Sequence, residues 1–112
     1  MPKRSTRESL KKIKVGSEGE LRLIVQKDLT ITKRALKKVR IIAPEKSYAK
    51  KIAQDFLGMA QAYYKDANHF KDSNDWVRAL ACVNYAHGWL DAGARLGIFD
   101  VDADDRLFTL AE

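Results

Sequence analysis

Residues 75–96 decide the fold, and they read DWVRALACVNYAHGWLDAGARL. An α-helix turns about 100° per residue, and this step brings one main stripe of apolar side chains together. The stripe comprises Trp76, Ala79, Leu80, Val83, Ala86, Leu90 and Ala94. Tyr85, Trp89 and Leu96 lie on other sides, so the predicted helix is apolar nearly all round. Such a helix is typical of the centre of a bundle or of a contact with another chain.

Two amphipathic helices are predicted before this one, at about 18–42 and 46–71. Ser17 and Glu20 have the capping-box spacing that starts a helix, and Pro44 disfavours helical geometry at the residue before it. The second helix has an apolar stripe that comprises Tyr48, Ile52, Phe56, Met59, Ala60, Tyr63, Ala67 and Phe70. The sequence therefore predicts an all-α protein, a small three-helix bundle built on an antiparallel helical hairpin.

The chain is long enough for a single domain. Of its 112 residues, 46% are hydrophobic and one is cysteine. We expect a flexible basic arm at 1–16 and one helical domain at 17–112, with a short tail after residue 97 docked on the bundle. The longest apolar run is only five residues, and the first residues lack the apolar stretch of a signal peptide. These features favour a cytoplasmic protein without a membrane partner.

Charge is unevenly distributed along the chain. Residues 1–51 carry a net charge of +11, whereas residues 52–112 carry −5. The first predicted helix has a basic face, which comprises Lys27, Lys33, Arg34, Lys37 and Lys38. One interpretation is that the face binds nucleic acid weakly and without sequence preference, because no aromatic residues interleave with the charges and no helix-turn-helix pattern is present. The other is that the two halves neutralise each other or are merely solvated.

A polar ridge on the helix at 75–96 is the candidate site for chemistry. It comprises Asn84, His87, Asp91 and Arg95, at steps of three, four and four residues. Tyr63 and Asp66 of the preceding helix are candidate neighbours. Convergence of these groups on an open pocket would indicate acid–base catalysis, whereas burial with every group paired would indicate a structural network.

Metal and cofactor sites are not predicted. The helices at 46–71 and 75–96 contain no glutamate, although a di-iron bundle needs several. The acidic run from Asp100 to Asp105 lacks the glycine and glutamate of a calcium loop, so we interpret it as a solvated turn.

Gly88 and Gly93 lower the stability of a helix interior, which predicts close approach of neighbouring helices at both positions. The helix at 75–96 has apolar side chains on nearly all sides, which also favours a homodimer.

The stretches FLGMA at 56–60, YYKDA at 63–67, WVRA at 76–79 and YAHGWLDAG at 85–93 resemble the archaeal proteins grouped as domain of unknown function 357. The resemblance spans roughly residues 20–110. It implies a small helical bundle built on a helical hairpin and an archaeal cytosolic source. It implies no established activity, substrate or cofactor, so no catalytic residue is assigned from it.

Two classes of function follow from these patterns. The favoured one is a non-catalytic binding or assembly module whose basic face contacts an anionic partner. The alternative is a small hydrolytic or metal-dependent enzyme that uses His87 and Asp91, with help from Asp66. The placement of the polar ridge in the folded protein distinguishes the two classes.

Overall fold

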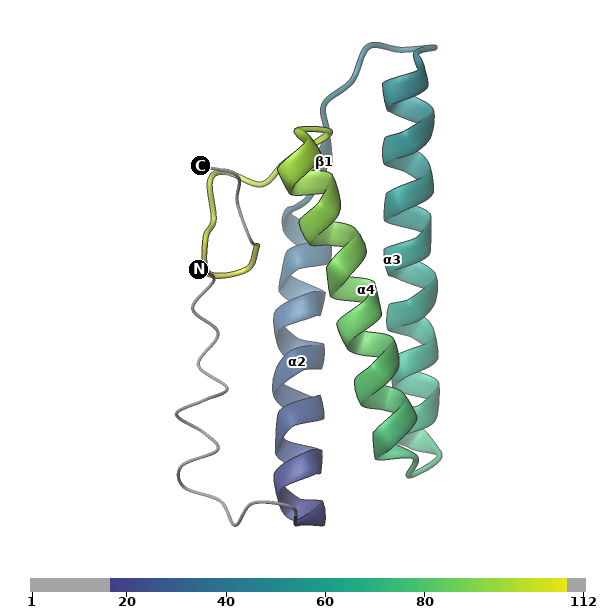
Figure 1. Ribbon diagram of the computed structural model, residues 1–112, viewed down its shortest axis with the longest axis vertical. Helices are drawn as coiled ribbons and strands as arrows, with labels where there is room; N and C mark the ends of the chain where they lie inside the picture. The colour runs from purple at the N-terminus through teal and green to yellow at the C-terminus, as the bar shows by residue number, and fades with distance from the viewer. Residues whose placement is uncertain (1–16, 109–112) are drawn as a thin grey trace.

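The computed structural model describes residues 17–108, in which three helices pack together and two very short strands pair. The helices are α2 (Glu18–Lys38), α3 (Tyr48–Asp72) and α4 (Trp76–Leu96). The all-α bundle on a helical hairpin is therefore confirmed, and α4 lies between α2 and α3 (Figure 1). The expected arm at 1–16 and the last four residues of the tail lie outside the described part of the chain.

Side-chain and backbone caps set the helix ends. The hydroxyl of Ser17 accepts from the backbone N–H of Glu20 at 2.9 Å, as the capping-box spacing predicts. Ser47 caps α3 in the same way, through the N–H of Lys50 at 3.1 Å. The carboxylate of Asp75 caps the N-terminus of α4. Gly97 caps its C-terminus and has a φ of 77°, in the left-handed region. Ser73 caps the C-terminus of α3, so the turn of the hairpin needs only residues 73–75.

Small side chains line the contact between α3 and α4. Ala53, Ala60 and Ala67 recur every seven residues on α3, and Ala79, Ala86 and Gly93 do so on α4; all six are buried. Ring contacts between Phe56 and Trp89 and between Tyr63 and Tyr85 fix the antiparallel register of the two helices. In this register Ala67 and Ala79 come together in one hydrophobic cluster, whereas the space beside Gly93 is filled by the ring of Phe99. We call the contact between α3 and α4 the alanine seam.

The first helix ends four residues earlier than expected. It was predicted to continue to Ile42, but α2 ends at Lys38, and β1 (Arg40–Ile41) pairs antiparallel with β2 (Phe99–Asp100). The N–H of Ile42 donates to the carbonyl of Ile98 at 3.0 Å, so the backbone finds partners across the chain instead of one turn back. The β-branched residues Val39, Ile41 and Ile42 suit this extended backbone.

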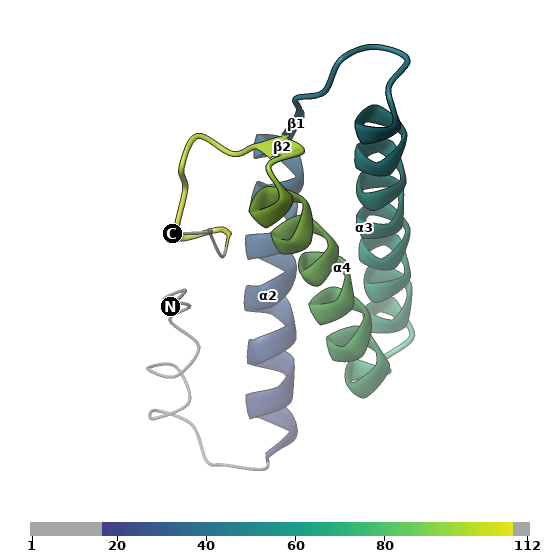
Figure 2. The ribbon, with the colours of Figure 1, turned by 45° about the horizontal axis from the view of Figure 1, so that its top comes forward.

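Beyond β2, the chain turns back beside α2 and α4 (Figure 2). Phe99, Val101 and Phe108 are all at most 5% exposed. Phe99 and Phe108 belong to the same hydrophobic cluster as Ala35 of α2 and Leu90 of α4. The described part of the tail is therefore a component of the core.

Of the two glycines within α4, only Gly93 has a neighbour in the space that a side chain would occupy. A Cβ at Gly93 would lie 2.2 Å from ring atoms of Phe99, so the ring occupies the space of the missing side chain. A Cβ at Gly88 would meet no atom within 4 Å, and this position is exposed. The prediction of close helix approach is therefore wrong at Gly88, and at Gly93 the neighbour belongs to β2 and not to a helix.

Alanine substitutions at these two glycines should have opposite effects on stability. Gly93→Ala should lower the free energy of unfolding by about 1–3 kcal/mol, because the new methyl group displaces the Phe99 ring. Gly88→Ala should raise it by about 0.5–1 kcal/mol, because alanine is the better helix former and nothing obstructs it. Urea unfolding followed by circular dichroism measures both. Equal stability of Gly93→Ala and the wild-type protein would contradict the packing assigned to Phe99.

Candidate functional site

A buried polar cluster lies between α2 and α4. Asp28 and Thr32 of α2 are 5% and 1% exposed, and His87 of α4 is 1% exposed. Asp28 and Thr32 interrupt the apolar stripe of their helix, and the structure shows that they lie on its buried face. Burial of polar groups is costly unless hydrogen bonds replace those to water, so their partners decide what the cluster does.

His87 joins three separate parts of the chain through its two ring nitrogens. Nδ1 lies 3.0 Å from the hydroxyl of Thr32, and Nε2 lies 2.5 Å from the backbone carbonyl oxygen of Leu107. A carbonyl oxygen only accepts, so Nε2 carries the proton and donates it to Leu107. In neutral histidine Nδ1 then accepts from the Thr32 hydroxyl. The imidazole thus ties α2, α4 and the C-terminal segment together.

The carboxylate of Asp91 is a more distant neighbour of the same ring. Its Oδ1 lies 3.6 Å from Nε2 of His87, beyond hydrogen-bond distance, whereas the Leu107 carbonyl is much closer. Leu107, and not Asp91, therefore fixes the tautomer, in contrast to the arrangement that the one-turn spacing suggests. A hydroxyl, an imidazole and a carboxylate in this order resemble a nucleophile with its general base. Catalysis also requires that a substrate can reach these groups.

Access to the cluster is closed in the described structure. The side chain of Phe108 is 1% exposed, and its ring centroid lies 6.3 Å from that of His87. Together with the carbonyl of Leu107, it covers the side of the imidazole that faces the C-terminal segment. A substrate could reach neither Thr32 nor His87 unless this segment moved away.

The remaining residues of the polar ridge do not converge on His87. Asn84 and Arg95 are exposed, and so is Asp66 of α3. Tyr63 instead packs edge to face on Tyr85, with ring centroids 4.5 Å apart, on the flank of α4 that faces α3. Thr32 is not among the site residues predicted from the sequence. Its only signal was a pair of polar residues, Asp28 and Thr32, one turn apart within an apolar stripe.

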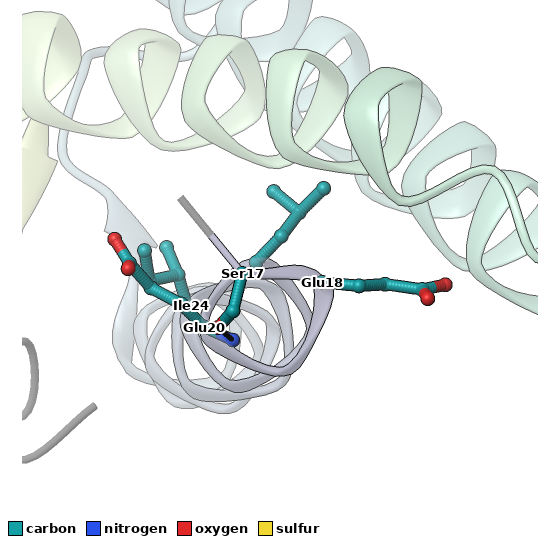
Figure 3. A pocket seen from close by; sticks show the side chains of 5 residues that line it. Ser17, Glu18, Glu20 and Ile24 are labelled. Atoms are coloured by element: carbon teal, nitrogen blue, oxygen red, sulfur yellow. Dashed lines mark hydrogen bonds between the residues drawn. The ribbon is translucent and has the colours of Figure 1, made fainter. Parts of the chain in front are cut away.

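No metal centre is evident in the described residues, because His, Cys, Asp and Glu side chains nowhere gather in a group of three there. A surface hollow of about 440 Å³ lies at the N-terminus of α2 and is lined by Ser17, Glu18, Glu20, Leu21 and Ile24. Figure 3 shows that Glu18 and Glu20 point away from each other, and the Ser17 hydroxyl already caps the helix. This hollow therefore lacks a pair of groups suited to acid–base chemistry.

The basic face of α2 divides into paired and unpaired cations. Lys33, Arg34 and Lys37 are exposed, and no ion pair joins them to any residue within 17–108. Nζ of Lys38 lies 3.2 Å from a carboxylate oxygen of Asp104. Just beyond the helix, Arg40 pairs with Asp100 at 2.8 Å and with Asp102 at 3.0 Å. The expected neutralisation between the two halves of the chain therefore occurs, but at one end of the face.

The acidic run after β2 is ordered by these contacts and by its own turns. Asp100 accepts from the N–H of Asp102, and this bond together with Arg40 holds the pKa of Asp100 below its ordinary value of 3.8. At Asp104, partial burial raises the pKa, but the N–H groups of Leu107 and Arg106 and the ammonium of Lys38 lower it further than burial raises it. The run is a turn, as expected, but its carboxylates contact cations of the other half of the chain.

These features define a small helical bundle with a closed polar core and a partly unpaired basic surface. The chain belongs to the family described as Protein of unknown function (DUF357), whose model matches residues 27–99. The match begins within α2, contains the whole hairpin and ends at Phe99, so it is shorter than the resemblance seen in the sequence. Neither a curated protein nor a solved structure matches the chain. Within residues 17–108, no helix combines the length and apolarity needed to cross a bilayer.

The bond between Thr32 and His87 can be tested with a nearly isosteric substitution. Thr32→Val removes the hydroxyl and leaves Nδ1 of the buried imidazole without its donor, which should lower the free energy of unfolding by about 1–3 kcal/mol. Thr30→Val is the matched control, because the Thr30 hydroxyl is exposed and bonds only to Gln26 of its own helix. The control should change stability by at most about 0.5 kcal/mol. Equal stabilities of the two variants in urea would disprove the structural role of the bond.

Proposed function

We propose that this protein is a non-catalytic binding module whose basic face on α2 contacts an anionic partner. The observation that carries the proposal is the exposure of Lys33, Arg34 and Lys37 without ion pairs in the described structure. Their spacing places them opposite the face of α2 that contains Val25, Thr32 and Ala35. They therefore point away from the bundle, where a partner can reach them.

Nucleic acid is the anionic partner that this surface suits best. Cations that neutralise phosphates release counterions, which drives association without reading the sequence. A few contacts of this kind correspond to weak binding, with a Kd of about 10⁻⁴–10⁻⁶ M at physiological salt. Base recognition would require an element that enters a groove, and the exposed side of α2 has the cations but no aromatic platform for stacking.

The enzyme alternative has less support. Its central group, His87, is 1% exposed and is held by Thr32 and Leu107, Asp91 lies 3.6 Å from its ring, and Asn84 and Arg95 are exposed. A buried and fully engaged imidazole favours a structural role over general acid–base catalysis. The basic surface, in contrast, is already accessible in the structure as it stands.

Neutralising the basic face should weaken binding to a short, labelled DNA duplex. The variant Lys33→Gln, Arg34→Gln, Lys37→Gln should lose affinity and show a shallower dependence on salt, by about 0.9 logarithmic units per lost phosphate contact. The control Lys51→Gln, Lys65→Gln, Lys71→Gln removes the same charge from α3. Fluorescence anisotropy at several salt concentrations measures both. Binding that is absent from the wild-type protein at low salt, or reduced equally in both variants, would refute the proposal.

An assembly role also has a specific observation in its favour. Phe56 and Tyr63 of α3 contact Trp89 and Tyr85 of α4 and form an aromatic flank along one side of the hairpin. Tyr85 is 52% exposed, and Leu96, on the same side of α4, is 63% exposed. Large apolar side chains that remain in contact with water along one flank favour self-association, so a homodimer through the aromatic flank is our second proposal.

A charge on the aromatic flank should prevent this dimer. Tyr85→Glu places a carboxylate within the flank, whereas Val77→Glu places one at an exposed apolar residue on another side of α4. Sedimentation velocity at high micromolar concentration should show a dimer for the wild-type protein and for Val77→Glu, and a monomer for Tyr85→Glu. A monomeric wild-type protein would rule the dimer out.

A further inference from the structure

The acidic run after β2 lies against one end of the surface that we propose to bind nucleic acid. Three of its carboxylates, on Asp100, Asp102 and Asp104, contact the cations at the C-terminal end of α2 and at β1. We call residues 100–104 the acidic strap. Its oxygens lie 2.8–3.2 Å from the nitrogens of Arg40 and Lys38, which is the distance at which a phosphate oxygen would bind the same groups.

We propose that the acidic strap is an autoinhibitory contact, which occupies Lys38 and Arg40 in the way that phosphates of the partner would. The inference rests on the proposed function, since it concerns how much of the basic surface the partner can use. With the strap in place, an incoming anion finds Lys33, Arg34 and Lys37 available but must compete with carboxylates for the two neighbouring cations. The strap therefore lowers the affinity of the protein for its partner and shortens the surface that the partner can contact.

The anchoring of the strap allows its carboxylates to be displaced without unfolding. Phe99 and Val101 are at most 5% exposed and hold the backbone of this segment against the bundle. In contrast, the side chain of Arg40 is 63% exposed, and those of Asp100 and Asp102 are 38% and 57% exposed. Ion pairs that are this open to water are weak and are screened by salt. A polyanion can therefore exchange with the carboxylates of Asp100 and Asp102 while the apolar anchors stay buried. The pair of Lys38 and Asp104 is less open to water, with side chains 35% and 19% exposed.

Asparagine substitutions can remove the charge of the strap and leave its turns intact. An asparagine side chain still accepts the backbone bonds that Asp100 and Asp104 accept from Asp102, Arg106 and Leu107. The test variant is Asp100→Asn, Asp102→Asn, Asp104→Asn. The matched control is Asp55→Asn, Asp66→Asn, Asp72→Asn, which changes the net charge by the same amount on exposed positions of α3.

The strap variant should bind the labelled duplex more tightly than both the wild-type protein and the control. Its plot of log affinity against log salt should also steepen by about two units, because two further cations can contact phosphates. If the wild-type protein binds and the strap variant gains no more than the control, the inference fails and the proposed function stands. If neither the wild-type protein nor the strap variant binds at low salt, the proposed function itself fails.

A second comparison removes the two cations, first with the strap unaltered and then in the strap variant. Lys38→Gln, Arg40→Gln should barely weaken binding by the wild-type protein, because the strap already occupies both cations, but the same changes should abolish the gain of the strap variant. The unaltered strap also keeps this test valid if the asparagine variant fails to fold. A loss of wild-type affinity as large as that caused by neutralising Lys33, Arg34 and Lys37 would show that Lys38 and Arg40 are already available, and would overturn the inference.

Discussion

The close approach of α3 and α4 along the alanine seam is the constraint on which the rest of the structure depends. Small residues recur at every seventh position on both helices, such as Ala60 on α3 and Ala86 on α4, and they are buried. The aromatic rings are therefore displaced to the flank, where Tyr63 packs on Tyr85. The other sides of α4 stay free for α2 and for the C-terminal segment, which is why α4 becomes the centre of the bundle.

A single imidazole then holds these additional layers in place. His87 donates to the carbonyl of Leu107 and accepts from Thr32, so its two nitrogens connect elements that are far apart in the sequence. Because the side chains of His87 and Thr32 are buried, they depend on these partners for their hydrogen bonds. The arrangement explains how a polar residue can lie within an apolar helix.

Tertiary structure decides which cations of the basic face form ion pairs. In the sequence, Lys33, Lys37 and Lys38 look equivalent, but only Lys38 lies close enough to the acidic run to pair with Asp104. The pairing of β1 with β2 decides this, since it brings Asp100 opposite Arg40. The two halves of the chain thus attract each other at one end of the basic face. Elsewhere on the same face, cations remain available to a partner.

The sequence by itself determined the three helices, the cap at Ser17, and the family to which the chain belongs, because these depend on local spacing and residue type. Only the tertiary structure decided that α2 ends at Lys38, that Gly88 is open to solvent, and that Thr32 rather than Asp91 bonds to His87. The reason is physical: helix periodicity fixes which side chains share a face, but a strand of two residues or a hydrogen bond between distant segments depends on which backbone groups meet after packing.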